Sequence, residues 1–157
     1  MVLEMIPPDE RTKTKQLLNA YLLEMGETAG PDGEVDYPYL DSYWQEPDRV
    51  ALKALYDGEW MGLVLINRFV LGEPKAGKRS IAEFYVLPAF RRKGLGRQMA
   101  HRVFEQYGGA WEVRQDIGRK AAQQFWRRVI GEYTQGRFEE VELCTAEYRV
   151  VMQCFDV

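Results

Sequence analysis

Apolar residues recur along this chain with two periods, one typical of helices and the other of strands. Helical spacing predicts helices in residues 7–25, 94–107 and 122–131, with a shorter one within residues 37–44. Short apolar or alternating runs predict strands in residues 3–6, 50–56, 60–67, 81–87, 111–117, 138–144 and 148–155. We expect the last two strands to pair antiparallel.

Turn residues separate these elements. Asp57-Gly58 stands between two apolar runs and predicts a tight hairpin. Gly108-Gly109 ends the preceding helix, and the polar or glycine-rich residues 26–33 and 71–80 predict loops. Because hairpins and helical crossovers occur together, the order of elements predicts an α/β (α+β layered) fold. Its mixed, mostly antiparallel sheet of about 6–7 strands would be flanked by about 4 helices.

Composition narrows the class of protein. The chain has 157 residues, 46% hydrophobic and 29% charged, so we expect residues 1–157 to form a single domain. The net charge of −3 gives no support for nucleic-acid binding. No apolar run could cross a bilayer and no signal peptide is recognisable, which predicts a cytoplasmic protein without membrane contact. Cys144 and Cys154 are expected as reduced thiols, and a single histidine, His101, makes a metal site unexpected.

The most distinctive segment follows the strand predicted in residues 81–87. Pro88 ends this strand, and the basic turn that follows opens a helix; the turn consists of Arg91, Arg92, Lys93, Gly94, Leu95, Gly96 and Arg97. Glycines let backbone N–H groups approach a ligand closely, and a helix N-terminus favours negative charge. A basic helix cap is the plainer interpretation. The strand-turn-helix context favours a pyrophosphate cradle, and hence a nucleotide-like cofactor.

Two other phosphate-binding motifs do not fit. Residues 72–78 match the opening of a P-loop, but Arg79 stands where the metal-binding Ser or Thr belongs, and a strand follows instead of a helix. The turn also lacks the third glycine or alanine of a dinucleotide-binding fingerprint, because Met99 occupies that position. The loop 71–80 is better explained as a connection between strands.

Residues 81–109 resemble the central motif of the GNAT superfamily of N-acyltransferases, in which an Arg/Gln-x-x-Gly-x-Gly/Ala turn follows a strand. Residues 119–126 resemble the family's second motif, Asn-x-x-Ala-x-x-Phe-Tyr, with Ala122 and Phe125 in register. Flanking segments such as 37–44 are similar to a bacterial subgroup of predicted acetyltransferases. The resemblance covers nearly the whole chain and implies the GNAT fold.

The resemblance also implies acetyl-CoA as the cofactor, with CoA as product. In the family the strand carries the pantetheine arm, and the turn wraps the pyrophosphate with backbone N–H groups. The positions carried over to cofactor binding are Tyr85, Val86, Leu87, Arg91, Arg92, Lys93, Gly94, Leu95, Gly96, Arg97, Arg119, Ala122, Phe125 and Trp126. Backbone N–H groups near Val86 and Leu87 are expected to stabilise the developing oxyanion.

Two residues are candidates for catalysis. The family often uses a strand carboxylate as general base, and Glu83 occupies such a position. Its apolar neighbours would raise its pKa. The alternative is a glutamate that is salt-bridged or faces solvent. Trp126 stands where the family often has a tyrosine as general acid, and an indole does not titrate. Tyr133 is the candidate to replace it as general acid. The alternative is that Tyr133 is a half-buried surface tyrosine without a catalytic role. Arg119 replaces the family's asparagine.

The acceptor side is less defined. Candidate substrate-binding residues are Tyr37, Tyr39, Tyr43 and Trp44, which could equally cover the core. His101 lies off the apolar face of its helix and is expected to be exposed. The resemblance implies an N-acetyltransferase that moves an acetyl group directly to an amine of a small molecule or peptide; the sequence is compatible with a homodimer. The alternatives are a GNAT-fold module that binds acyl-CoA without turnover, or an acyltransferase that uses another acyl chain or a hydroxyl acceptor.

Overall fold

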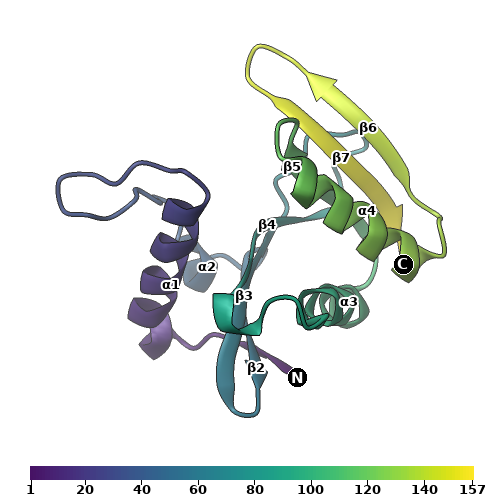
Figure 1. Cartoon of the computed structure of the whole chain (residues 1–157). Helices are drawn as coiled ribbons and strands as arrows, with labels where there is room; N and C mark the ends of the chain where they lie inside the picture. The colour runs from purple at the N-terminus through teal and green to yellow at the C-terminus, as the bar shows by residue number, and fades with distance from the viewer. The chain divides into compact units, whose positions relative to one another are not determined.

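The computed structural model describes residues 1–157 and contains one mixed sheet of seven strands (Figure 1). The strands are β1 (Val2–Met5), β2 (Val50–Tyr56), β3 (Glu59–Asn67), β4 (Arg79–Val86), β5 (Ala110–Asp116), β6 (Glu139–Cys144) and β7 (Arg149–Asp156). The helices are α1 (Arg11–Glu24), α2 (Ser42–Gln45), α3 (Leu95–Tyr107) and α4 (Lys120–Thr134), with 3-10 turns η1 (Pro8–Glu10) and η2 (Pro88–Phe90). The strand order is β1-β2-β3-β4-β5-β7-β6, which confirms the predicted α/β fold.

The chain divides into two compact units. Unit 1 comprises residues 1–66 and 82–93, and unit 2 comprises residues 67–81 and 94–157. In unit 1, β1 pairs antiparallel with β2, and β2 pairs antiparallel with β3. The β2–β3 hairpin turns at Asp57 and Gly58, whose φ angles of 50° and 80° lie in the left-handed region that a type I′ turn requires. The hairpin predicted from this dipeptide is therefore confirmed.

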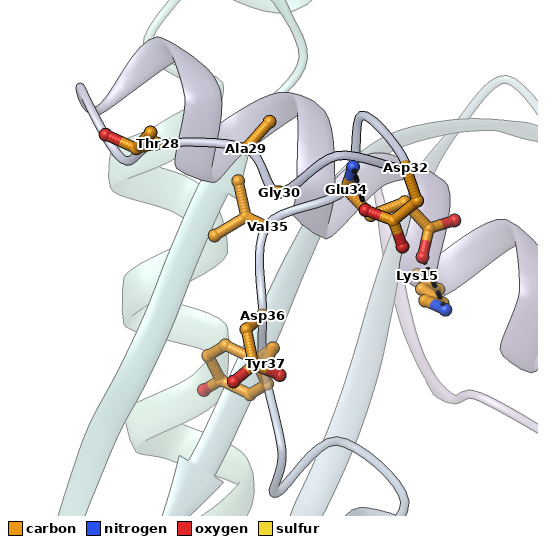
Figure 2. Close-up of a pocket in the computed structure, with 9 residues that line it drawn as sticks. All are labelled: Lys15, Thr28, Ala29, Gly30, Asp32, Glu34, Val35, Asp36 and Tyr37. Atoms are coloured by element: carbon orange, nitrogen blue, oxygen red, sulfur yellow. Dashed lines mark hydrogen bonds and ion pairs between the residues drawn. The ribbon is translucent and has the colours of Figure 1, made fainter.

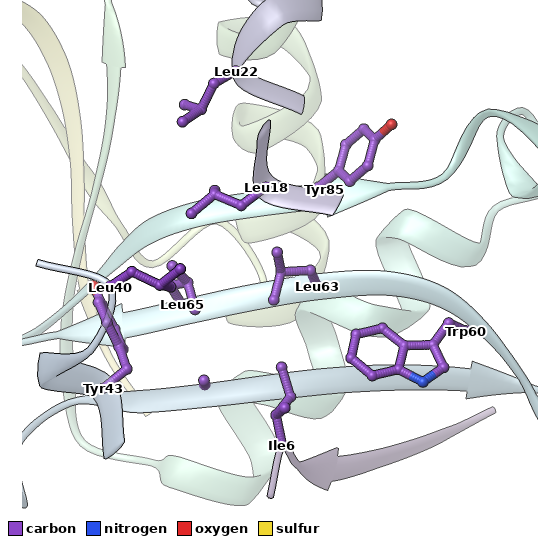
Figure 3. Close-up of a cluster of buried hydrophobic side chains, with 10 residues drawn as sticks. Ile6, Leu18, Leu22, Leu40, Tyr43, Trp60, Leu63, Leu65 and Tyr85 are labelled. Carbon is purple, nitrogen blue, oxygen red and sulfur yellow. The ribbon is translucent and has the colours of Figure 1, made fainter. Parts of the chain in front are cut away.

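The core of unit 1 is formed by one face of α1 against the sheet. Leu18 and Leu22 of α1 pack with Leu63 and Leu65 of β3 and with Tyr85 of β4 (Figure 3). The two α1 leucines are four residues apart and so share a face of the helix. Burying each such side chain contributes about 1.5–3 kcal/mol. This packing brings the side chains at the C-terminal end of α1 beside β4, where the site described below is formed.

Unit 2 contains the C-terminal strands and the helices α3 and α4. β5 pairs antiparallel with β7 along its length, and β7 pairs antiparallel with β6, as predicted for the last two strands. The first residues of β4, Arg79 and Ser80, pair in parallel with the start of β5. α4 contacts β5 and β7 (Figure 1). Phe104 of α3 is the centre of an aromatic cluster in this unit; its partners are Trp111, Trp126, Tyr133 and Phe155.

Two helices differ from the prediction. The expected end of the last helix at Gly131 is wrong, because α4 continues to Thr134 and turns at Gln135 and Gly136, with φ angles of 55° and 79°. The Gly136 N–H donates to the Gly131 carbonyl at 2.8 Å, so the second glycine, not the first, closes the helix. The helix expected within residues 37–44 is reduced to the single turn of α2. None of the helices combines the length and apolar character needed to span a bilayer.

Candidate active site

Glu83 lies in the middle of β4, and tyrosines from two other segments surround its carboxylate. Tyr21 of α1 and Tyr37, from the segment between α1 and α2, each donate a side-chain hydrogen bond to Glu83. Alternation along β4 places Glu83 on the same side as Tyr85, whose ring belongs to the unit 1 core and packs on Tyr21 with centroids 5.0 Å apart. The carboxylate is therefore held by neutral hydroxyl donors and has no cationic partner among the groups that act on it.

The environment of Glu83 makes its carboxyl group a weak acid. Burial raises its pKa to about 7, although the hydrogen bonds from Tyr37 and Tyr21 favour the charged form; the nearby charge of Glu27 raises the pKa further. Burial and the charge of Glu83 also raise the pKa of Tyr37, so its hydroxyl stays protonated and keeps donating at neutral pH. A carboxyl group with a pKa near the operating pH is well matched to general-base chemistry.

A pocket opens beside Tyr37 (Figure 2). Its volume is about 480 Å³, and Tyr37 and Asp36 lie at one end, with Lys15, Asp32 and Glu34 at the other. Contacts with α1 hold this segment: the Val35 N–H donates to the Asn19 side chain, and Lys15 pairs with Glu34 at 2.8 Å. Asp32 accepts from the Glu34 N–H, whereas Asp36 makes no hydrogen bond or ion pair. The lining carries three carboxylates against one ammonium group.

The four aromatic residues predicted to bind substrate lie in different environments. Tyr37 contacts both Glu83 and Tyr43, and Tyr43 is buried in the unit 1 core. Trp44 donates its indole N–H to the Ile6 carbonyl at 2.8 Å, and Tyr39 is 63% exposed. Tyr37 is thus the member of the group that reaches the candidate base.

The predicted pyrophosphate turn has the backbone shape that a cradle needs. Arg92 and Gly94 have φ angles of 61° and 73°, and Gly94 caps α3 in this left-handed conformation. No side chain caps the first turn of α3, and a Cβ atom at Gly94 would enter open space. Arg92 and Lys93 are exposed, and Lys93 contacts the Ala89 carbonyl at 3.1 Å. Uncapped N–H groups beside exposed cations fit an anionic group such as a pyrophosphate.

The other members of the predicted turn are engaged within the chain. Arg97 pairs with Glu132 at 3.2 Å on the surface of unit 2. The Arg91 side chain contacts Glu24, Tyr85 and the Val86 carbonyl. The expectation for the oxyanion is corrected at Leu87, because its N–H already donates to the Met61 carbonyl at 2.8 Å in the sheet of unit 1.

The second predicted motif lies at the start of α4 in unit 2. Arg119 is exposed just before the helix, whereas Ala122 and Phe125 are partly buried. Trp126 is only 6% exposed, and its ring packs with Phe104 and Phe125. Such burial is typical of a core residue, and the cofactor contacts of these positions stay predictions.

Tyr133 and His101 contact each other in unit 2. Their ring centroids are 5.2 Å apart, and Tyr133 also packs on Phe104 at 5.4 Å. Burial raises the pKa of the Tyr133 phenol. The expectation of an exposed His101 is wrong, because its Nε2 hydrogen-bonds with the Val129 carbonyl at 2.9 Å and its ring is partly buried. A role for Tyr133 as general acid stays a prediction.

Three residues near the candidate base were not predicted from the sequence. Tyr21 was recognised only as part of the apolar face of its helix, and neither Glu24 nor Glu27 was assigned a role. The available signal was a tyrosine in that face, because a buried phenol needs a partner for its hydroxyl group. Its partner, Glu83, lies 62 residues along the chain from Tyr21 and only tertiary packing reveals the contact.

The model of the acetyltransferase (GNAT) family matches residues 15–131. The chain belongs to the GNAT acetyltransferase family. No curated protein sequence matches it. As a family member it carries both expected motifs, the basic turn and the start of α4, within the matched residues.

Solved structures share the fold of this GNAT protein. One is a GNAT family acetyltransferase from Brucella melitensis in complex with acetyl-CoA, with 18% identity, 99% of this chain and 86% of that chain covered, and a TM-score of 0.63. Another is the aminoglycoside acetyltransferase AAC(6′)-Ib in complex with coenzyme A and kanamycin, with 17% identity, 99% and 94% coverage, and a TM-score of 0.68. A ribosomal-protein-alanine N-acetyltransferase from Brucella melitensis has 16% identity, complete coverage of both chains and a TM-score of 0.67. At these identities the likeness establishes the fold.

Proposed function

We propose that this GNAT protein is an acetyl-CoA-dependent N-acetyltransferase, with residues 1–157 acting as one domain and Glu83 as its general base. The observation that carries the proposal is the carboxyl group of Glu83, partly buried on β4, hydrogen-bonded by Tyr21 and Tyr37, and with a pKa of about 7. Family membership supports acetyl transfer, and solved relatives that hold acetyl-CoA or CoA support the choice of donor.

The proposed role of Glu83 is to remove a proton from the amine of the acceptor. An alkyl ammonium group has a pKa of about 10, so presenting the neutral amine at pH 7 costs roughly 4 kcal/mol. In the proposed reaction Glu83 accepts a proton from the acceptor nitrogen, and that nitrogen forms a C–N bond as the thioester C–S bond breaks. The sulfur leaves as a thiolate and gains a proton from solvent, and Glu83 releases the proton that it accepted to solvent before the next turnover. Acetyl-CoA supplies the acetyl group in this scheme, and holding both reactants in place lowers the entropic part of the barrier.

The turn that starts α3 is proposed to bind the phosphates of the donor. Its positive φ at Gly94 and the uncapped first turn of α3 support backbone N–H contacts, and the exposed Arg92 and Lys93 add positive charge. This assignment depends on the backbone conformation. An acidic residue in place of Gly94 would therefore weaken binding of the donor, because it would strain the backbone at this positive φ angle and would repel the phosphates.

The pocket beside Tyr37 is the proposed entry for the acceptor. It shares Tyr37 with the contacts of Glu83, so a ligand in the pocket would lie against the residue whose hydroxyl group contacts the proposed base. The excess of carboxylates in its lining favours a positively charged amine over a neutral or anionic one. Both a small-molecule amine and a peptide amine fit this description.

A transfer assay tests the proposal. The purified protein is incubated with acetyl-CoA and a library of small amines and peptides, and acetylated products are detected by mass spectrometry. We expect products from cationic amines and their loss in Glu83→Gln, which removes the base but keeps the size of the side chain. Calorimetry measures acetyl-CoA binding in parallel. Absence of acetyl-CoA binding would overturn the proposal, and binding without transfer to any amine would favour the non-catalytic alternative.

A further inference from the structure

The guanidinium group of Arg91 makes three hydrogen bonds and one ring contact with residues of unit 1. Its Nη2 atom donates to a carboxylate oxygen of Glu24 at 2.8 Å, and Nη1 donates to the other oxygen of the same carboxylate. Its Nε atom donates to the Val86 carbonyl at 2.8 Å, and the group lies over the Tyr85 ring, 5.4 Å from the centroid. A bidentate Arg–carboxylate pair with a third hydrogen bond and a ring contact is a specific, directional arrangement.

The Glu24 carboxylate balances the positive charge of Arg91. The hydrogen bond to Arg91 lowers the pKa of Glu24, and the same bond raises that of Arg91, so both groups are held in the charged form. Arg92, the next residue, is exposed and makes no hydrogen bond or ion pair. Of these two consecutive arginines, Arg92 has its charge available to a ligand, whereas Arg91 has its charge matched by Glu24.

Glu24 connects this pair with the candidate base. Glu24 and Tyr21 lie three residues apart on the last turns of α1 and so share one face of the helix. Tyr21 packs on Tyr85 with centroids 5.0 Å apart and donates to Glu83. The ion pair thus ties the end of α1 to the end of β4, next to the contact between Tyr21 and Glu83.

We propose that Glu24 and Arg91 are a pair of positioning residues that lock the C-terminal end of α1 onto β4 and so hold the Tyr21 hydroxyl group on the Glu83 carboxylate. Arg91 then acts through the base and not as a ligand of the phosphates. This inference rests on the proposed role of Glu83. The groups that face the Glu83 carboxylate are Tyr21 from α1, Tyr37 from the pocket segment and Glu27 from the residues after α1.

Direct titration of Glu83 is the first test, because it needs no activity. Carboxyl ¹³C NMR follows the Glu83 resonance against pH in the wild type and in Tyr21→Phe, Glu24→Gln, Arg91→Gln and the double variant Glu24→Gln/Arg91→Gln. Loss of the Tyr21 hydrogen bond removes a contact that favours the carboxylate, so Tyr21→Phe shifts the Glu83 pKa upward. We expect Glu24→Gln and Arg91→Gln to shift it in the same direction, and the double variant to shift it no further than one single variant.

A matched ion pair serves as control. Arg127 and Glu140 form a surface pair at 2.7 Å in unit 2, and neither residue is assigned a role. Arg127→Gln and Glu140→Gln should leave the titration of Glu83 unchanged. Circular dichroism confirms that each variant is folded, and Arg91→Lys, which keeps the charge but loses the bidentate geometry, replaces Arg91→Gln if that variant is unfolded.

CoA binding separates the two roles of Arg91. We expect the Kd for CoA to stay within about twofold of the wild type in Glu24→Gln and Arg91→Gln, and to rise about tenfold or more in Arg92→Ala, which removes one charge-assisted contact. A tenfold loss in Arg91→Gln with none in Glu24→Gln would show that Arg91 is a phosphate ligand and overturn the inference. If Glu83 titrates near 7 but does not move in either variant, the pair has no positioning role. If Glu83 titrates near its ordinary value in the wild type, the proposed base itself is wrong.

Discussion

As the proposed general base, Glu83 must meet two requirements that oppose each other in a folded protein. A base must be able to lose its proton near neutral pH, yet it must also be shielded enough from water to be a better proton acceptor than an ordinary carboxylate. Burial supplies the second property, and the hydroxyl groups of Tyr21 and Tyr37 keep the charged form accessible. The balance between these effects belongs to single residues, so single substitutions should shift it measurably.

Replacement of Glu83 by glutamine should change the pH dependence of catalysis. In the wild type kcat/KM should rise as pH increases through about 7, because Glu83 must lose its proton before it can accept one from the acceptor. Glu83→Gln should lower kcat/KM by about 10²–10⁴-fold and remove this limb, leaving only the ionisation of the amine. Steady-state rates between pH 5 and 10 measure both effects. A limb near 7 that survives in Glu83→Gln would mean that another group is the base.

The same carboxyl group should affect stability against pH. Its pKa is about 7 in the folded protein and 4.5 without the fold, so the folded state binds more protons between these values. The free energy of unfolding therefore falls as pH rises from about 4.5 to about 7, by about 3 kcal/mol from this group. The amide side chain in Glu83→Gln does not titrate, so this part of the fall in the free energy of unfolding should be absent from that variant. Urea denaturation of both proteins at pH 5 and pH 8 gives the difference, and parallel curves for the two proteins would contradict the assignment.

At the scale of elements, one helix face, one turn and one loop position the residues discussed above. α1 contributes Tyr21 to the base because Leu18 and Leu22 bury one face of the helix against the sheet (Figure 3). The turn before α3 has the conformation of a cradle because Gly94 adopts a positive φ angle at the helix N-cap. In unit 2 the loop before β4 is held by Glu112, a fully buried carboxylate that accepts the N–H groups of Leu71 and Gly72 and pairs with Arg114.

Substitution of Gly94 tests the cradle. Gly94→Glu should weaken CoA binding by more than tenfold, because it places a negative charge at a backbone site proposed to meet the pyrophosphate. Gly58 offers a matched control: its φ is also positive, at 80°, and its added side chain would likewise meet open space. Gly58→Glu should cost a similar strain of about 1 kcal/mol yet leave CoA binding unchanged. Calorimetric titration with CoA measures the difference, and equal affinities in both variants would mean that the cradle is elsewhere.

Substitution of Glu112 tests the anchoring of the loop. Its carboxylate oxygens receive the Leu71 and Gly72 N–H groups at 2.8 and 2.7 Å and Arg114 at 2.6 Å. Glu112→Ala leaves the two N–H donors without a partner and removes the carboxylate that pairs with Arg114, and it should reduce the free energy of unfolding by about 3–5 kcal/mol. Chemical denaturation measures the loss. Glu142→Ala, an exposed glutamate on β6, should stay within about 0.5 kcal/mol of the wild type.

At the scale of the whole molecule, binding of the donor should stabilise the folded chain. A ligand that binds only the folded state at 100 times its Kd contributes about 2.7 kcal/mol. For a chain of this length that corresponds to an increase in Tm of about 5–10 °C, since about 1 kcal/mol shifts the Tm by about 2–4 °C. Thermal denaturation with and without CoA measures it. Gly94→Glu should show little of this shift, and a full shift in that variant would contradict the proposed phosphate site.

Much of the architecture was predictable because local sequence determines it. Asp57-Gly58 predicts its hairpin, since few dipeptides adopt two consecutive positive φ angles easily. The basic turn and the start of α4 identified the family through spacing that a strand-turn-helix connection requires. The end of α4 was misplaced because Gly131 and Gly136 are equally good stop signals in the sequence, and the helix passes the first.

The candidate site could be predicted only in part. The sequence singled out Glu83 because a carboxylate inside an apolar strand is unusual, and it identified Tyr37 as one of four aromatic candidates. It could not choose between Tyr37, Tyr39, Tyr43 and Trp44, since all four have similar chemistry and neighbouring positions. Their different environments, from the contact with Glu83 to 63% exposure at Tyr39, follow from how this segment packs on α1 and β4.

The sequence by itself determined the order of the elements, the family and the turn that is proposed to bind phosphate, because these depend on residue type and spacing over short stretches of chain. The tertiary structure alone decided the protonation of Glu83 and the partner of Arg91. Tyr21, Glu24 and Tyr37 reach these groups across 46 to 67 residues of sequence. Burial and hydrogen bonding are properties of atoms that meet in space, and only the packing of α1 on the sheet brings these atoms together.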